Sequence, residues 1–153
     1  MIRVLVAAAL LTVPAMAGAE RVEEILAAAE AECAEMDAGG LSVEAGAVTP
    51  ADLDGDGRED DAVVDFGAVF CDYNLSHWHG TGGAPIHFVI DGTWSQSWWA
   101  HYWSVLDFDG MRVILLARHG SYCDSYGAAP CVQAIVAGEA EFFTPVDGRA
   151  EEG

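Results

Sequence analysis

An acidic stretch in the first half of the chain constrains its structure more than any other feature. It reads Asp52-Leu53-Asp54-Gly55-Asp56-Gly57-Arg58-Glu59-Asp60-Asp61. In a loop that starts at Asp52, carboxylates fall at positions 1, 3, 5 and 9, and glycine falls at position 6. Two such carboxylates held within about 5 Å repel each other by roughly 3–4 kcal/mol at an effective dielectric constant near 20. A hard dication removes that cost, and calcium prefers a cage of about six to eight oxygen atoms.

The stretch therefore predicts a calcium site. Gly57 permits the sharp reversal of the backbone that such a site needs, because a left-handed conformation costs little only for glycine. The alternative is a solvated acidic turn whose carboxylates splay apart in water. The expected ligands are the side chains of Asp52, Asp54, Asp56 and Asp60, together with the backbone carbonyl of Arg58.

The spacing of these residues resembles the Asp-rich calcium loops of FG-GAP and integrin-type repeats, and more distantly dockerin loops. It departs from the EF-hand pattern, because Val63 stands at position 12 in place of the bidentate glutamate and the charged Glu59 stands at position 8. Residues 62–66 have the character of a strand. The resemblance implies a calcium loop that leads into a strand. FG-GAP repeats form propellers as arrays, so a single copy does not predict a propeller.

The N-terminus has the pattern of a secretory signal peptide. Arg3 precedes an uncharged run from Val4 to Val13, and small residues follow at Ala17 and Ala19. The apolar run is too short to span a bilayer. We expect a periplasmic or secreted protein with a signal peptide at 1–19, one domain at 20–146 and a flexible tail at 147–153.

Charge excludes several classes of function. The formal net charge is −19, and the chain contains no lysine. Nucleic acids and anionic membranes are therefore poor partners. P-loop, Schiff-base and pyridoxal chemistry all need a lysine. The expected partner of this monomer is an unidentified protein or carbohydrate.

Four cysteines, an even number, predict disulfides in an exported chain. Three pairings are possible, and we favour Cys33–Cys71 with Cys123–Cys131, because the second pair brackets the turn-rich segment 124–130. The rival is a zinc site that combines these thiolates with histidines. The chain has no CxxC pair, which disfavours zinc.

Periodicity predicts an α+β fold, with one N-terminal helix packed on a mostly antiparallel sheet. The helix is expected over 20–36, with a buried face that consists of Val22, Ile25, Leu26, Ala29, Cys33 and Met36. Turn signals such as Asp91-Gly92 separate the apolar runs that follow. The predicted strands cover 41–48, 62–69, 86–90, 93–106, 111–117, 132–137 and 140–143.

The glycine-rich segment 71–85 is predicted to be a loop, and it carries His77 and His79 on either side of Trp78. This H-x-H spacing can hold zinc or copper when a third ligand, such as His87 or His101, arrives from elsewhere. A metal-activated water at such a site would make the protein an exported hydrolase. The alternative is a set of ordinary loop histidines.

Aromatic residues crowd the segment 93–106. On one continuous strand, Trp99, His101 and Trp103 would share a face, and this face could form a platform for a sugar or a peptide. Packing in the core is the alternative. His119, Ser121 and Asp124 do not predict a catalytic triad, because a nucleophile and a base two residues apart rarely point at each other.

As a whole, the order of helix, acidic loop, Gly-rich segment, Trp-rich strand and cysteine-containing C-terminal loop resembles that of small exported bacterial proteins. The sequence predicts a small exported domain that binds structural Ca²⁺ and acts by binding or interaction, with no catalytic residues assigned. The alternative is the exported hydrolase with a histidine-ligated zinc or copper ion.

Overall fold

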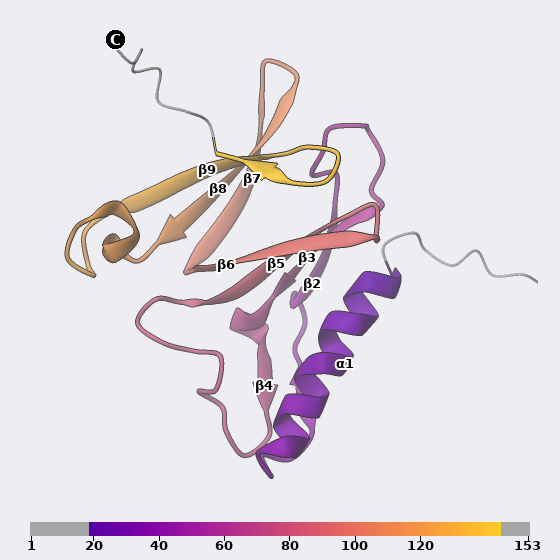
Figure 1. Cartoon of the computed structure of the whole chain (residues 1–153), viewed down its shortest axis with the longest axis vertical. Helices are drawn as coiled ribbons and strands as arrows, with labels where there is room; N and C mark the ends of the chain where they lie inside the picture. Colours follow the sequence, from indigo (N-terminus) through magenta and orange to yellow (C-terminus); the bar gives the residue numbers. More distant parts are fainter. Residues whose placement is uncertain (1–18, 145–153) are drawn as a thin grey trace, which may run out of the picture.

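The computed structural model describes residues 19–144, which form one α-helix and ten strands (Figure 1). The predicted signal peptide and tail lie largely outside these residues. No helix within 19–144 has the length and apolar character needed to cross a bilayer. The elements are α1 (Ala19–Glu35), β1 (Leu41–Val43), β2 (Val48–Ala51), β3 (Asp61–Asp65), the 3₁₀ turn η1 (Phe66–Ala68), β4 (Val69–Cys71), β5 (Ala84–Ile90), β6 (Trp94–Ala100), β7 (Tyr102–Phe108), β8 (Met111–Arg118), the 3₁₀ turn η2 (Gly120–Cys123), β9 (Cys131–Ala137) and β10 (Phe142–Phe143).

The α+β class is confirmed, but the strands form three sheets and not one. A central sheet has the order β2-β3-β5-β6, and a second sheet has the order β10-β9-β8-β7. Strands β1 and β4 form a small third sheet near the C-terminal end of α1. Every strand pair in these sheets is antiparallel. Helix α1, the central sheet and the second sheet follow one another as layers.

A first core lies between α1 and the central sheet. The helix contributes a stripe of buried residues at the spacing expected for one face, and they cluster with Ala62 and Val64 of β3 and Val89 of β5. Met36 is 41% exposed, because the helix already ends at Glu35, so the prediction that Met36 is buried is wrong. The buried helix residues are Val22, Ile25, Ala29 and Cys33.

A second core lies between the central sheet and the second sheet. Successive residues of a strand point to opposite faces. Val63 of β3 and Phe88 of β5 therefore face away from the helix, while their neighbours face toward it. Strands β3 and β5 are thus buried on both sides. The other fully buried members of this core are Leu53, Ile86, Ile90, Ile114, Leu116 and Ile135.

Two of the predicted strands are divided between sheets, so the prediction of continuous strands at 41–48 and 62–69 is wrong. The first becomes β1 and β2, separated by a turn in which Gly46 has φ 90°. The second becomes β3 and β4, separated by η1, which Asp65 caps by accepting a hydrogen bond from the Gly67 N–H at 2.8 Å. Turns this short leave no break in an apolar sequence pattern.

The predicted strand 93–106 also changes sheets. Ala100 ends β6 opposite Ala84, and the N–H of His101 then donates to the carbonyl of Ala117 in the second sheet. A Cβ atom on Gly83 would lie 2.0 Å from the Ala100 oxygen, so only glycine fits beside this crossover. A single residue, His101, therefore links the two large sheets.

The predicted hairpins are confirmed. The turn at Asp91-Gly92 joins β5 to β6, and the turn at Asp109-Gly110 joins β7 to β8. All four residues have positive φ angles, of 49°, 62°, 51° and 78°, as tight turns with Asp-Gly require. Strand β8 lies between β7 and β9, as expected of a run that is apolar on both faces.

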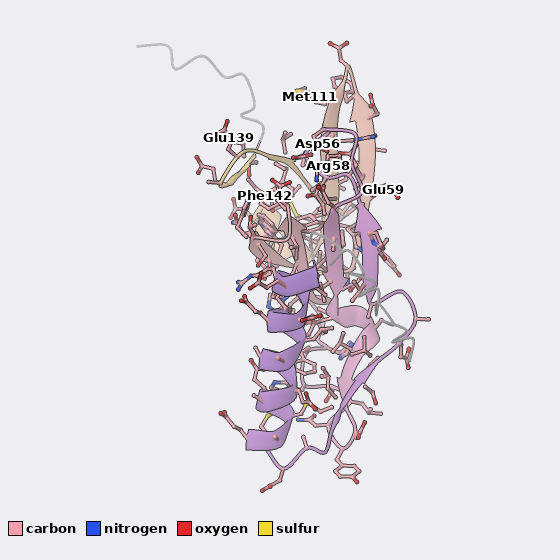
Figure 2. The ribbon with its side chains drawn as sticks, turned by 90° about the vertical axis from the view of Figure 1, so that its right-hand side faces the viewer. Asp56, Arg58, Glu59, Met111, Glu139 and Phe142 are labelled. Carbon is pink, nitrogen blue, oxygen red and sulfur yellow. A yellow bond between two sulfur atoms is a disulfide. The ribbon has the colours of Figure 1, made fainter. Side chains whose placement is uncertain are left out.

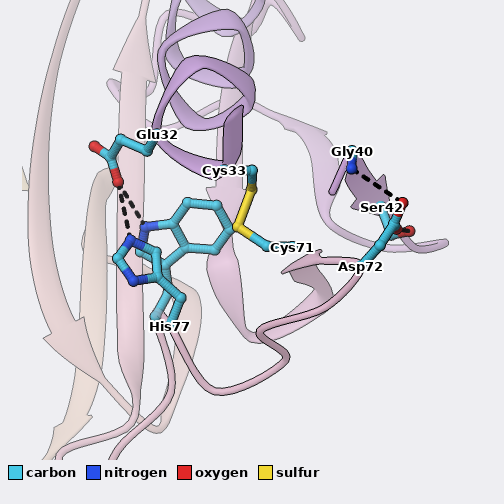
Figure 3. The surroundings of a disulfide bond; sticks show 8 residues. Glu32, Cys33, Gly40, Ser42, Cys71, Asp72 and His77 are labelled. Atoms are coloured by element: carbon cyan, nitrogen blue, oxygen red, sulfur yellow. Dashed lines mark hydrogen bonds and ion pairs between the residues drawn. A yellow bond between two sulfur atoms is a disulfide. The ribbon is translucent and has the colours of Figure 1, made fainter. Parts of the chain in front are cut away.

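Both predicted disulfides are present. Cys33–Cys71 fastens the last turn of α1 to β4 and is fully buried (Figure 3). Cys123–Cys131 closes the loop before β9. Disulfides of this kind are typical of proteins that fold outside a reducing cytoplasm.

The two disulfides are expected to contribute unequally to stability. Replacing both Cys33 and Cys71 with alanine should lower the free energy of unfolding by about 4 kcal/mol, and replacing Cys123 and Cys131 by about 2.5 kcal/mol, because the first closes the longer loop. Urea denaturation of the two double variants measures this difference. Equal losses would contradict the loop-length argument.

Candidate metal centre in the acidic loop

The acidic loop is organised around Asp61, the first residue of β3. Asp61 is only 3% exposed, and it is the one buried charged residue among those described. Its Oδ2 accepts hydrogen bonds from the N–H groups of Leu53 at 2.7 Å and Asp54 at 3.3 Å. Its Oδ1 accepts from the N–H of Asp91 at 2.8 Å. One carboxylate therefore joins the loop to the turn between β5 and β6.

Burial raises the pKa of Asp61 above its ordinary value. The hydrogen bonds from Asp91 and Leu53 oppose this shift, and the nearby charge of Asp54 reinforces it. A charge that is both buried and close to other carboxylates gains from any cation that reaches it. Asp61 is thus a natural centre for a metal site.

Two groups of aspartates can each offer three ligand oxygens that lie within 4.8 Å of one another. The first group is Asp52, Asp54 and Asp61, and the second is Asp60, Asp61 and Asp91. Asp61 belongs to both groups. The loop and the β5–β6 turn therefore converge on one acidic centre.

Short-range hydrogen bonds shape the backbone of the loop. The carboxylate of Asp52 accepts from Gly55 N–H at 2.7 Å, and that of Asp54 accepts from Asp56 N–H at 3.0 Å. The side chain of Leu53 is fully buried in the second core and thereby anchors the loop to the body of the protein. Gly55 and Gly57 have φ angles of 84° and 86°, which favour glycine. The oxygens are consequently held by a preformed turn.

Two arginines balance part of the negative charge. Arg112 of β8 donates to Oδ2 of Asp52 at 3.1 Å and lies 3.6 Å from a carboxylate oxygen of Asp107. Arg58 forms an ion pair with Asp60 from within the loop. The loop lies beside the β7–β8 hairpin, near the Met111 end that Figure 2 labels. A cation that binds Asp52 through Oδ2 must compete with Arg112.

The aspartates that lie together in the structure differ in part from the predicted calcium ligands, and they are centred on Asp61. Asp52 and Asp54 lie together as expected, whereas Asp60 belongs to the second group and Asp56 belongs to neither. Arg58 contacts the loop carboxylates through its guanidinium, and its carbonyl stays a predicted ligand only. Asp61 and Asp91, which were not among the predicted ligands, complete the two groups.

The histidines do not form the predicted transition-metal site. Both groups of potential metal ligands within residues 19–144 consist of aspartates alone. His77 Nε2 lies 3.2 Å from Glu32 of α1 (Figure 3), and His79 stacks on Phe70 with ring centroids 4.7 Å apart. His87 packs against Phe66 with ring centroids 5.1 Å apart. The ring nitrogens of the three predicted ligands therefore do not converge.

The predicted aromatic platform is not formed either. Trp99 on β6 lies on the helix side of the central sheet, where it lines a cleft beneath α1. Trp103 on β7 packs on the other side, in the second core, with its ring 6.2 Å from that of Phe88. His101 is exposed at the crossover between them. The three side chains do not share a face because the strand that would carry them is two strands.

His119 and Ser121 lie closer than expected. Nδ1 of His119 lies 2.8 Å from Oγ of Ser121, so the expectation that the two do not meet is wrong. The same Nδ1 accepts a hydrogen bond from the N–H of Ser121 at 3.4 Å, which caps the start of η2, and Asp124 caps its end in a left-handed conformation. Among the described residues, Asp124 makes no hydrogen bond to His119 that would complete a triad.

Comparisons with protein-family models, with curated proteins and with solved structures give no match for this chain.

Asp61 is expected to be the most sensitive residue of the loop. Asp61→Ala removes the acceptor of three backbone N–H groups and should lower the free energy of unfolding by about 3 kcal/mol. Asp61→Asn should cost less, because it keeps one carbonyl oxygen. Urea denaturation in the presence of EDTA measures the effect without a contribution from metal ions.

The matched control is Glu59→Gln, which changes an exposed carboxylate of the same loop. Its effect should stay within about 0.5 kcal/mol. An equal loss for Asp61→Ala and Glu59→Gln would contradict the bridging role of Asp61.

Proposed function

We propose that this chain is a small, exported, disulfide-bonded domain that binds one calcium ion at its acidic loop and acts by binding another molecule. The observation that carries the calcium site is the convergence of carboxylate oxygens from Asp52, Asp54 and Asp61 within 4.8 Å. Hard carboxylate oxygens at this separation are the donors that calcium prefers.

Charge supports a cation at this place. Five aspartates contribute to the two groups, and the arginines nearest to them are Arg58 and Arg112. The side chains therefore leave a net negative charge at the centre. Calcium tolerates irregular oxygen cages, whereas magnesium requires a nearly ideal octahedron. A cluster that draws its oxygens from a loop and from a separate turn favours calcium.

The ion would act on structure. It would join the loop of Asp52 and Asp54 to Asp61 at the start of β3, which already bonds to the turn at Asp91. The central sheet and the loop would then be held by an ion as well as by hydrogen bonds. A periplasmic or secreted location would suit this role, because sites of this class bind in the millimolar range of extracellular calcium.

Calcium titration of the EDTA-treated protein tests the proposal. We expect a dissociation constant of about 10⁻⁴–10⁻³ M by isothermal titration calorimetry. At a tenfold excess over that constant, calcium should stabilise the protein by about 1.4 kcal/mol. Asp54→Asn should abolish the heat of binding and the rise in melting temperature. An absence of both in the unaltered protein at 10 mM calcium, on the order of tenfold above the expected constant, would sink the proposal.

Arg112→Met is a variant for which we expect calcium affinity to increase, whereas Asp54→Asn should abolish binding. The methionine keeps the apolar stem that packs near Gly55, and it frees Oδ2 of Asp52 from its ion pair. If calcium binds Asp52, its affinity should increase in this variant. Glu139→Gln changes an exposed carboxylate that belongs to neither group of potential ligands, and it should leave the affinity unaltered. A lower affinity in Arg112→Met would exclude Asp52 as a ligand.

A further inference from the structure

A cleft of about 550 Å³ runs between α1 and the strands β5 and β6. Its volume lies within the range of roughly 300–1,000 Å³ that is usual for small-molecule sites. It lies on the opposite side of the central sheet from the second core, in which Leu53 anchors the acidic loop. The cleft is therefore separate from the proposed calcium site.

The helix that forms one side of the cleft is fastened near both of its ends. Near its N-terminal end, Nε of Arg21 donates to Oγ of Ser95 on β6 at 3.0 Å. At its C-terminal end, Cys33 is bonded to Cys71. Between these points the helix presents the small side chains of Ala28 and Ala29, which do not fill the space above the strands.

Indole rings form two of the walls. Trp99 is 39% exposed, and a Cβ atom added at Gly80 or Gly82 of the preceding loop would lie about 4 Å from its ring. Trp78 is buried edge-on against Phe66, with ring centroids 5.0 Å apart, and its Nε1 donates to Glu32 at 3.2 Å. The ring of Trp78 is thus held in position, and the more exposed ring of Trp99 is open to a ligand.

The floor of the cleft carries polar groups that have no protein partner. No described residue forms a hydrogen bond with the ring of His87 or with the hydroxyl of Ser97, and both side chains line the cleft. Burial lowers the pKa of His87, and the charge of Arg21 acts in the same direction. The imidazole is therefore neutral at pH 7 and offers one donor and one acceptor.

The charged side chains that line the cleft already have partners. Arg21 forms a 2.7 Å ion pair with Glu24, and Glu32 accepts hydrogen bonds from His77 and Trp78. The carboxylate oxygens that these contacts use are less open to an organic cation, and the formal charge of −19 repels anions. A neutral ligand with an apolar face and many hydroxyl groups matches this combination of ring faces, donors and acceptors.

From this arrangement we infer that the cleft binds a neutral oligosaccharide, one sugar ring of which stacks on Trp99 while its hydroxyl groups bond with His87 and Ser97. The inference concerns a site other than the calcium loop and does not depend on it.

Saturation-transfer NMR and calorimetry with maltotriose, cellotriose, xylotriose and chitotriose test the inference, with choline as a cationic probe. At least one trisaccharide should bind, both with calcium and with EDTA. Trp99→Ala should weaken that binding about tenfold or more, because a ring at the centre of a site carries much of the affinity. Trp99→Phe should retain part of it.

Ser97→Ala changes an exposed strand residue and should weaken binding without altering the melting temperature. Tyr102→Ala, which removes a 76% exposed ring outside the cleft, should leave binding unchanged. The inference is overturned if none of the trisaccharides binds at 10 mM, on the order of the upper limit for a weak ligand. Binding of choline alone, or sugar binding that survives both Trp99→Ala and Ser97→Ala, would also overturn it.

Discussion

The carboxylate of Asp61 connects parts of the molecule that lie far apart in the sequence. Removing a carboxylate from water is costly unless hydrogen bonds replace its hydration. Three backbone N–H groups, from Leu53, Asp54 and Asp91, provide that replacement. Because each donor must stay in place to keep the charge satisfied, the acidic loop and the β5–β6 turn hold each other in position. Strands β3 and β5 of the central sheet adjoin this carboxylate and the turn that it binds.

The sequence pattern predicted correctly those helices, turns and strands that are determined by residues close together in the chain. The apolar stripe of α1, the Asp-Gly turns and the central position of β8 all depend on residues within a few positions of one another. The three-sheet arrangement depends on the interruption at Phe66–Ala68 and on the crossover at His101, and neither interrupts the apolar pattern. Trp99, His101 and Trp103 alternate in the sequence as they would on one strand, so alternation alone could not reveal the change of sheet.

The ligand set of the acidic centre could likewise be predicted only in part from residues close together in the sequence. Counting loop positions assigned the ninth place to Asp60, whereas the pairing of β3 with β2 begins at Asp61 and turns that residue inward. The run of apolar residues after Asp61 was a signal that could have indicated its burial. Asp91 carried no such signal, because it lies 30 residues away and only the packing of β5 on β3 brings it near. A ligand that comes from a distant part of the sequence is determined by how the strands pair, and the local sequence does not show that pairing.

The one-residue link at His101 has a consequence for how this chain can change over evolutionary time. Since neighbouring side chains on a strand point to opposite faces, a single insertion or deletion between Ala100 and Tyr102 would invert every side chain of β7 relative to β6. Trp103 and Val105 would leave the second core, and the more exposed Ser104 and Leu106 would replace them. Length variation should therefore be confined to loops such as 71–83, and the crossover should keep a constant length wherever this architecture recurs.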